Sequence, residues 1–292
     1  MGARTARRAD GGPVDLLTNP ALARLHPTGE HPERPERLLA LGGEAVERYA
    51  TEEQLARTHT AGHLALLRSI DRPVHLDVDT VASPTSWEAA TLAAGITLEA
   101  VDRNAFALVR PPGHHALADR AMGFCLVNNL AVAARYAQAE LGLARVAIVD
   151  YDVHHGNGTE EIFRGDDSVL FVSLHQWPFY PGTGGPGTSD ETTLNVPLPA
   201  GSGDSEYRAA FESSVEPAVR AFAPDLLLVS AGLDAHAEDP LGGMEVSDEG
   251  FRELSRRCAA LAPRIAAVLE GGYNLETLPR LVTVAQEGFS SG

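Results

Sequence analysis

The sequence predicts an α/β fold in which helices cover both faces of a parallel sheet. Short runs of apolar, largely aliphatic residues alternate along the chain with longer stretches of helical periodicity. Helices of this length between strands make right-handed crossovers, and these produce a parallel sheet. The 292 residues are enough for one large domain with its own core.

Five apolar runs are the predicted strands. They span residues 105–109, 146–149, 169–174, 226–230 and 265–269. Each run is short and almost wholly apolar, which is typical of a strand that is buried on both faces.

Four helices are predicted from capping signals and periodicity. Thr85 and Glu88 have the spacing of a capping box, which opens a helix that runs to about Val101. A second helix covers residues 129–141 and ends before Gly142, because glycine readily adopts the left-handed conformation that closes a helix. A third helix is predicted after Asp204 and continues towards Phe222. A fourth follows Ser247 and ends at about Ala262.

Composition limits the domain organisation and the partners. We expect one catalytic domain over residues 14–292, because residues 1–13 are small, polar and without periodicity, as in a frayed tail. The net charge of −17 disfavours nucleic acid and anionic lipid as partners. No apolar run approaches the ~18 residues that cross a bilayer, so no membrane association is expected. Cys125 and Cys258 are too few for a disulfide framework, which favours a reducing, cytoplasmic setting.

Polar residues gather directly after four of the five predicted strands. These loops read Arg110-Pro-Pro-Gly-His-His, Asp150-Tyr-Asp-Val-His-His-Gly-Asn-Gly, Ala231-Gly-Leu-Asp-Ala-His and Glu270-Gly-Gly-Tyr-Asn. In open α/β sheets, ligands bind beyond the carboxyl ends of the strands. We therefore expect the functional site at that edge of the sheet.

One of these loops has the spacing of metal ligands. Asp150, Asp152 and His154 alternate with period two, so on an extended strand end their side chains share one face. With Asp234 from another strand end, they suit zinc or another first-row divalent ion, and three protein ligands leave a position for water and substrate. The alternative is that the Asp-x-Asp-x-His pattern only caps the next helix.

A histidine pair and a tyrosine supply candidate acid–base groups. Beside a metal, a neutral histidine such as His114 or His115 can take a proton from water and return it to a leaving group. Tyr273 follows a glycine turn that can aim its hydroxyl at a developing oxyanion. Away from a metal, a histidine pair is more often structural or exposed to solvent.

Taken together, these motifs, with Gly123-Phe-Cys and Ser173-Leu-His, resemble the zinc-dependent histone deacetylase family. That family also contains bacterial acetoin-utilisation proteins and acetylpolyamine amidohydrolases. The match extends from about His31 to Leu278 in the family's order and spacing, and it begins with His31-Pro-Glu-Arg-Pro-Glu-Arg, which resembles the family's opening. The resemblance implies the arginase/deacetylase fold, a single three-layer αβα domain around a central, mostly parallel sheet of eight strands.

The resemblance also implies a role for each motif residue. The zinc ligands would be Asp152, His154 and Asp234. His115 would be the general base that activates water and the acid that protonates the leaving amine, and His114 with Asp150 would act electrostatically. Asn157 would face His115, as in the class II branch, and a neutral partner should leave that histidine a weaker base than aspartate would. Tyr273 would hydrogen-bond to the acyl carbonyl.

A substrate channel and a monovalent cation site are implied in the same way. The channel for an acyl-lysine chain would be lined by Gly123, Phe124, Tyr180 and Leu241. Potassium would be held by backbone carbonyls and one hydroxyl, from Asp150, Asp152, His154, Leu174 and Ser173. A second cation would fall near Phe163, Asp166, Val169 and Tyr207, and Asp79 is the candidate for a rim aspartate.

The favoured function is removal of an acetyl or other acyl group from lysine in a protein or peptide. The alternative substrate is an acetylpolyamine or another small acylated amine. Polyamine-specific members have an acidic gatekeeper where Leu241 stands, and leucine offers nothing to a second ammonium. An arginase-type ureohydrolase would need a further carboxylate at Gly232. A non-catalytic binder of acyl-lysine should have lost a ligand, the histidine pair or the tyrosine, and all are present.

Overall fold

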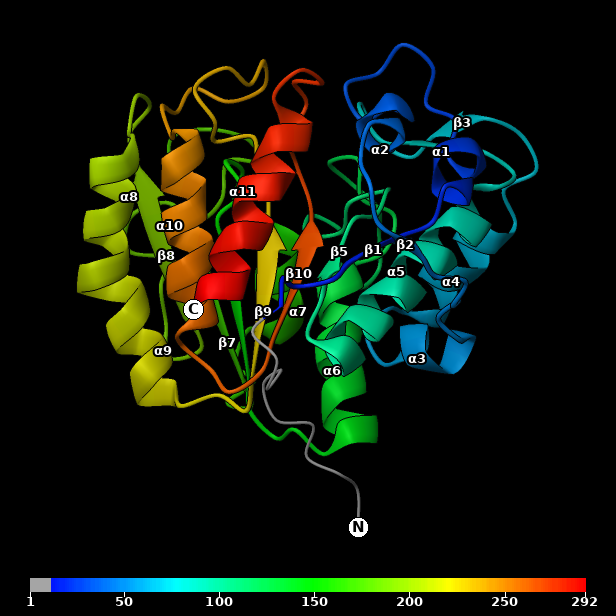
Figure 1. The fold of residues 1–292 in the computed structure, drawn as a ribbon. Helices are drawn as coiled ribbons and strands as arrows, with labels where there is room; N and C mark the ends of the chain where they lie inside the picture. The colour runs from blue at the N-terminus through cyan, green and yellow to red at the C-terminus, as the bar shows by residue number, and fades with distance from the viewer. Residues whose placement is uncertain (1–11) are drawn as a thin grey trace.

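The computed structural model describes residues 12–292, and one parallel sheet runs through it (Figure 1). Its strands follow the order β2-β1-β5-β10-β9-β6-β7-β8, and every neighbouring pair is parallel. The expected sheet of eight strands is therefore confirmed, and it is wholly rather than mostly parallel over the described residues. The frayed tail is expected over residues 1–13. Of these, residues 1–11 lie outside the described part of the chain.

The strands of this sheet are short at one side, in β2, β1 and β5, and longer over the rest of the sheet. They are β1 (Leu16–Thr18), β2 (Glu44–Ala45), β5 (Phe106–Ala107), β6 (Val146–Asp150), β7 (Val169–Gln176), β8 (Thr193–Leu198), β9 (Leu226–Ala231) and β10 (Ile265–Leu269). A separate antiparallel hairpin consists of β3 (Val74–His75) and β4 (Val81–Ala82). All residues of β6, β7 and β9 are buried, as their apolar sequences predict.

Helices flank the sheet. Figure 1 shows α10 (Asp248–Ala259) and α11 (Leu278–Ser291) side by side in front of β9 and β10. Two further helices pack together, α5 (Ser86–Arg103) against β10 and α6 (Asn129–Leu141) against β6 and β9. The remaining helices are α1 (Ala21–Leu25), α2 (Glu36–Leu39), α3 (Glu52–Ala56), α4 (Ala61–Arg68), α7 (Asn157–Phe163), α8 (Asp204–Ala210) and α9 (Glu216–Phe222).

The predicted elements are present, with two corrections. The predicted capping box at Thr85 is wrong: this residue has helical φ and ψ of −101° and −2°, and its side chain accepts no bond from the backbone of α5. Capping needs an extended residue, and Ser86 Oγ instead accepts from the Ser83 N–H at 2.8 Å. The predicted strand over 105–109 pairs only at Phe106 and Ala107.

The helix expected between Asp204 and Phe222 is continuous but contains a π-helical segment, Phe211–Val215. Pro217 follows this segment and has no N–H to donate to the preceding turn. A local widening of the helix accommodates that missing donor.

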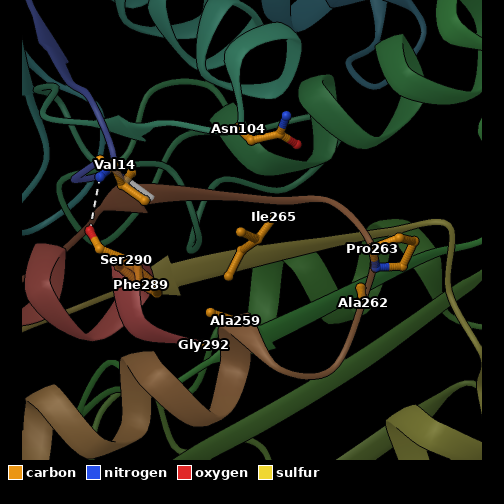
Figure 2. Close-up of a pocket in the computed structure, with 10 residues that line it drawn as sticks. Val14, Asn104, Ala259, Ala262, Pro263, Ile265, Phe289, Ser290 and Gly292 are labelled. Carbon is orange, nitrogen blue, oxygen red and sulfur yellow. Dashed lines mark hydrogen bonds between the residues drawn. The ribbon is translucent and has the colours of Figure 1, made fainter. Parts of the chain in front are cut away.

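A cavity of about 170 Å³ lies at the amino edge of the sheet, between the start of β10 and the end of α11 (Figure 2). Ile265 and Phe289 line it, and the Val14 N–H donates to Ser290 Oγ at 2.8 Å beside it. Because Ile265 begins β10, this cavity is at the other end of the strand from the Glu270 loop. No helix within residues 12–292 is long and apolar enough to span a membrane.

Candidate active site

The four polar loops leave four adjacent strands. The sheet order places β5, β10, β9 and β6 next to one another, and Asp150 pairs with Ser230 while Leu269 pairs with Ala231. Their carboxyl ends therefore lie level at one edge. This register brings together loops that are separated by up to about 160 residues along the chain.

Asp152, His154 and Asp234 form a cluster with the geometry of a metal site. One ligand atom from each lies within 4.8 Å of the others. The Nδ1 atom of His154 is 3.1 Å from Asp152 Oδ1 and 3.2 Å from Asp234 Oδ2. The N–H of Val153 donates to Asp234 Oδ1 at 2.9 Å, so the β6 loop itself orients the carboxylate from β9.

The cluster carries more negative charge than its own residues neutralise. Asp234 Oδ2 is buried and receives no hydrogen bond from the described residues. Burial, and then the neighbouring carboxylate of Asp152, raise the pKa of Asp234 to about 7. Burial alone would lower the pKa of His154, but Asp152 and Asp234 outweigh it and raise that pKa to about 10. A divalent cation fits these carboxylate and imidazole donors and would supply the missing positive charge.

Two glycines allow the loops to close around this cluster. A Cβ atom at Gly232 would lie 2.1 Å from Asp152 Oδ2, and one at Gly271 would lie 2.0 Å from Asp234 Oδ2. Neither position can hold a side chain while the carboxylates stay where they are. The loops after β9 and β10 therefore approach the ligands through bare backbone.

His114 is held by a buried carboxylate. Its Nδ1 lies 2.9 Å from Asp150 Oδ2, and its Nε2 lies 3.8 Å from Asp152 Oδ1. Burial lowers the pKa of His114, but the charges of Asp152 and Asp150 dominate and raise it to about 10. His114 therefore lies in hydrogen-bond contact with Asp150, and this ring favours the charged form.

His115 has a neutral partner and the opposite tendency. Its Nδ1–H donates to Asn157 Oδ1 at 2.8 Å, which leaves Nε2 as the nitrogen that can accept a proton. Burial, followed by the neighbouring His114 and His154, lowers the pKa of His115 well below its usual value. The amide of Asn157 also donates to Met122 Sδ at 3.4 Å, which orients its oxygen towards the histidine.

Tyr273 is carried by the glycine turn after β10. Its N–H donates to Asp239 Oδ2 at 2.7 Å, and the Arg37 guanidinium lies 4.8 Å from the centre of its ring. Arg37 Nε also donates to the carbonyl of Gly272 at 2.7 Å. Burial raises the pKa of Tyr273 well above its ordinary value, so the hydroxyl keeps its proton and remains a donor.

Aromatic rings surround these groups. The ring centre of Tyr180 lies 5.2 Å from that of His115, and Phe124 lies 5.8 Å from Tyr273. Phe179 stacks on His154 at 5.2 Å with an interplanar angle of 16°. Such flat apolar walls suit an extended methylene chain.

Gly123 and Phe124 both have positive φ, at +56° and +69°. A Cβ atom at Gly123 would lie 2.4 Å from the His115 ring, so this wall, too, needs glycine. Leu241 lies two residues beyond Asp239, whose Oδ1 accepts its N–H at 2.9 Å. It is thereby tied to the carboxylate that also holds Tyr273.

Comparison with known proteins identifies the family. The model of the histone deacetylase domain matches residues 24–289. The chain belongs to the histone deacetylase family. The fold is similar to that of the solved HDA15 HD domain, which superposes with a TM-score of 0.89 and 37% identity over 94% of this chain and 89% of that one.

Relatives from plants and archaea belong to the same family. The chloroplastic histone deacetylase 10 of Oryza sativa is 47% identical over 68% of this chain, but this chain matches only 50% of that protein. A probable deacetylase of Archaeoglobus fulgidus is 39% identical over 84% of this chain and 77% of its own length. The chain therefore spans half of the rice relative and most of the archaeal one.

The structure brings the predicted ligands, the histidine pair and Tyr273 to one edge of the sheet. Sequence reasoning missed four contacts there, made by Arg37, Met122, Phe179 and Asp239. Arg37 ends the His31-Pro-Glu-Arg-Pro-Glu-Arg segment, whose pattern indicates the family but no contact. The separation of more than 200 residues between Arg37 and Tyr273 hides their proximity.

At the second expected cation site, the structure contains an arginine. The guanidinium of Arg135 lies 4.8 Å from the Phe163 ring centre and 2.7 Å from Asp166 Oδ2. An ion pair already balances this carboxylate.

Proposed function

We propose that this protein is a zinc-dependent deacetylase that hydrolyses the acyl amide of a lysine side chain in a peptide or protein, with residues 14–292 as its catalytic domain. One observation carries the proposal. The metal-ligand cluster, the His114–His115 pair and Tyr273 come from four separate strand ends and lie around one point.

Zinc is the metal that suits this donor set best. Asp152, His154 and Asp234 would hold it with one imidazole nitrogen and carboxylate oxygens, which is a ligand set of catalytic zinc. When bound, the ion supplies Lewis acidity at the acyl carbonyl and to water. Its charge would also offset the buried Asp234 oxygen that accepts no hydrogen bond from the described residues.

The surrounding side chains supply the proton transfers. As water adds to the acyl carbon, one of its protons passes to Nε2 of His115, which its bond to Asn157 leaves free to accept it. The hydroxyl of Tyr273 donates to the acyl oxygen while negative charge develops there. The C–N bond then breaks, the leaving amine takes the proton from His115, and the acid and free amine depart.

A lysine side chain in a peptide is preferred to a polyamine. Leu241 is half-buried and carries no charge that could hold a second ammonium. A flat aromatic wall at Phe124 and Tyr180 recognises the methylene chain whatever group lies at its far end. A small acylated amine therefore remains the alternative substrate.

Potassium is proposed near the zinc ligands, held by the carbonyls of Asp150, Asp152, His154 and Leu174 and the hydroxyl of Ser173. The Ser173 side chain is oriented for this role. His175 Nε2 donates to the Gly184 carbonyl at 2.9 Å, so its Nδ1 accepts the Ser173 hydroxyl proton at 3.0 Å. Burial lowers the pKa of His175 to about 4 and keeps it in this neutral form. The lone pairs of the serine oxygen are then free for a cation.

A two-metal ureohydrolase is disfavoured by packing. That chemistry needs a further carboxylate at position 232, where a Cβ atom would lie 2.1 Å from Asp152 Oδ2. Within residues 12–292, one group of three metal-ligating side chains is present.

The test is turnover of a fluorogenic acetyl-lysine peptide by the zinc-loaded protein, compared with acetylputrescine. We expect hydrolysis of the peptide, inhibition by a hydroxamate chelator, and a loss of kcat of about 100-fold or more in Tyr273→Phe, because one oxyanion donor is removed. Zinc content and melting temperature of the variant serve as controls. A protein that binds zinc stoichiometrically but hydrolyses neither substrate would contradict the proposal.

A further inference from the structure

Glu270 is a fully buried carboxyl group that touches two loops of the site. It follows β10 directly and is 0% exposed. Its Oε2 accepts the backbone N–H of Gly113 at 2.6 Å and that of His114 at 3.2 Å. The side chain thus reaches from the loop that carries Tyr273 to the loop that carries the histidine pair.

The backbone of Glu270 and its neighbour is anchored separately. The Gly271 N–H donates to Asp152 Oδ2 at 2.8 Å, and the Leu233 N–H donates to the Gly271 carbonyl at 3.1 Å. These bonds place the start of the β10 loop against the metal ligands. The backbone that carries the Glu270 side chain is therefore fixed independently of its contacts with Gly113 and His114.

The histidine loop extends well beyond the paired part of its strand, and besides Glu270 the N–H groups of Gly158 and Thr159 bond to the His114 carbonyl at 3.1 and 3.2 Å. The strand β5 pairs with β10 only at Phe106 and Ala107, and His115 lies eight residues beyond that last pair. The hydrogen bonds between β5 and β10 therefore do not position residues 113–115. The bonds to Glu270 are interactions between the two loops that act directly at the histidine pair.

We propose that Glu270 is a positioning residue, whose Oε2 fixes the His114–His115 loop relative to the Tyr273 loop. This inference rests on the proposed deacetylase function, in which these side chains act on one substrate. We call the two hydrogen bonds from Gly113 and His114 to Glu270 the clamp. Catalysis then requires the clamp because His115 and Tyr273 must meet opposite sides of the same acyl group, and an error of 1 Å costs about 100-fold in rate.

The clamp needs an acceptor oxygen and no charge. Glu270 Oε1 is buried and receives no hydrogen bond from the described residues, so a single oxygen makes both contacts. A glutamine side chain has the same shape and can present its carbonyl oxygen to both N–H groups. Alanine leaves both donors buried without an acceptor, which is costly for each.

The experiment compares Glu270→Gln and Glu270→Ala with the wild type. Asp225→Ala is the matched control: Asp225 Oδ2 accepts the Arg145 N–H at 3.0 Å and so joins the starts of β6 and β9, at the opposite edge of the sheet. The first readout is hydrogen–deuterium exchange over residues 111–116. We expect at least about tenfold faster exchange there in Glu270→Ala, and near wild-type protection in Glu270→Gln and in the control.

The second readout is steady-state kinetics of the zinc-loaded variants. We expect Glu270→Ala to lower kcat about 100-fold with KM within about threefold, and with zinc content unchanged, because the zinc ligands are intact. Glu270→Gln should keep kcat within about fivefold.

Two outcomes would overturn the clamp: wild-type exchange and kcat in Glu270→Ala, or a Glu270→Gln protein as impaired as Glu270→Ala, which would assign the role to charge. If the alanine variant does not fold, the glutamine variant decides alone, by the same exchange and kinetic criteria. Exchange does not depend on the substrate, so a wild type without turnover would refute the proposed function while the clamp is still tested.

Discussion

At the scale of single residues, the buried ring of His59 uses both of its nitrogens. The Nδ1–H of His59 donates to the Leu117 carbonyl at 3.0 Å, and its Nε2 accepts the Asn128 N–H at 2.9 Å. This pattern exists only for the neutral ring, because a charged imidazole has no lone pair. Burial, with the nearby His63, lowers the pKa of His59 to about 4.

We expect His59→Gln to reduce the loss of stability in acid. In the unfolded chain the ring binds a proton below its pKa of about 6.5. In the folded protein it stays neutral until the pH reaches about 4. Wild-type stability contributed by this group is therefore present above pH 6.5 and falls, by about 3 kcal/mol in all, as the pH drops to 4. Glutamine can donate and accept in the same positions and does not titrate.

The measurement is the free energy of unfolding of both proteins in urea between pH 4 and 7. The difference between them isolates His59, because all other groups titrate in both proteins. A difference that stays constant over this range would show that the ring has the same pKa in the folded and unfolded states, and would contradict the prediction.

At the scale of elements, α5 packs closely on the chain before it because it is rich in small residues. Gly95 is the point of closest approach: a Cβ atom there would lie 2.0 Å from the Arg48 carbonyl oxygen and 2.8 Å from the Ala50 nitrogen. Both neighbours are backbone atoms that cannot rotate away. The sequence of α5 thus sets its distance from residues 48–50.

Gly95→Ala is expected to lower the free energy of unfolding by roughly 2 kcal/mol or more, because the helix must move outward. Gly62→Ala in α4 is the matched control. Nothing lies within 4 Å of a Cβ atom there, so alanine should be neutral or stabilise by up to about 1 kcal/mol through its helix propensity. Urea unfolding of both variants checks the pair, and an equal change in stability at the two sites would contradict close packing at Gly95.

At the scale of the whole molecule, the proposed metal ligands come from two neighbouring strands in the middle of the sheet. Asp152 and His154 follow β6, and Asp234 follows β9. These side chains are largely buried, and Asp234 Oδ2 accepts no hydrogen bond from the described residues. A bound divalent ion should therefore stabilise the whole fold.

We expect zinc at a hundredfold excess over its Kd to add about 2.7 kcal/mol, which corresponds to a rise in Tm of roughly 4 °C for a chain of this size. Asp234→Asn should abolish the rise, since the amide cannot replace the carboxylate ligand. Differential scanning calorimetry of both proteins, with zinc and with chelator, measures the change in Tm. An equal rise in the variant would place the ion elsewhere.

The elements with long, uniform patterns were predictable. The apolar runs of β6, β7, β9 and β10 and the capped helix α6 match their sequence signals to within two residues. The strands β1, β2 and β8 were missed, because they are short, exposed or partly polar. Their pairing depends on neighbours from distant parts of the chain.

The fold class follows from the sequence pattern, and the same pattern predicts the edge of the sheet at which Asp152, His154, Asp234, the histidine pair and Tyr273 lie. These are local patterns: a strand, its end, and the side chains directly after it. Only the tertiary structure decided how the loops are held together, by Glu270 on Gly113, Arg37 on Gly272 and Asp239 on Tyr273. Each is a hydrogen bond between a side chain and the backbone of a distant segment. Almost every residue type carries the same backbone N–H and C=O groups, so the sequence does not show which of them will be the partner.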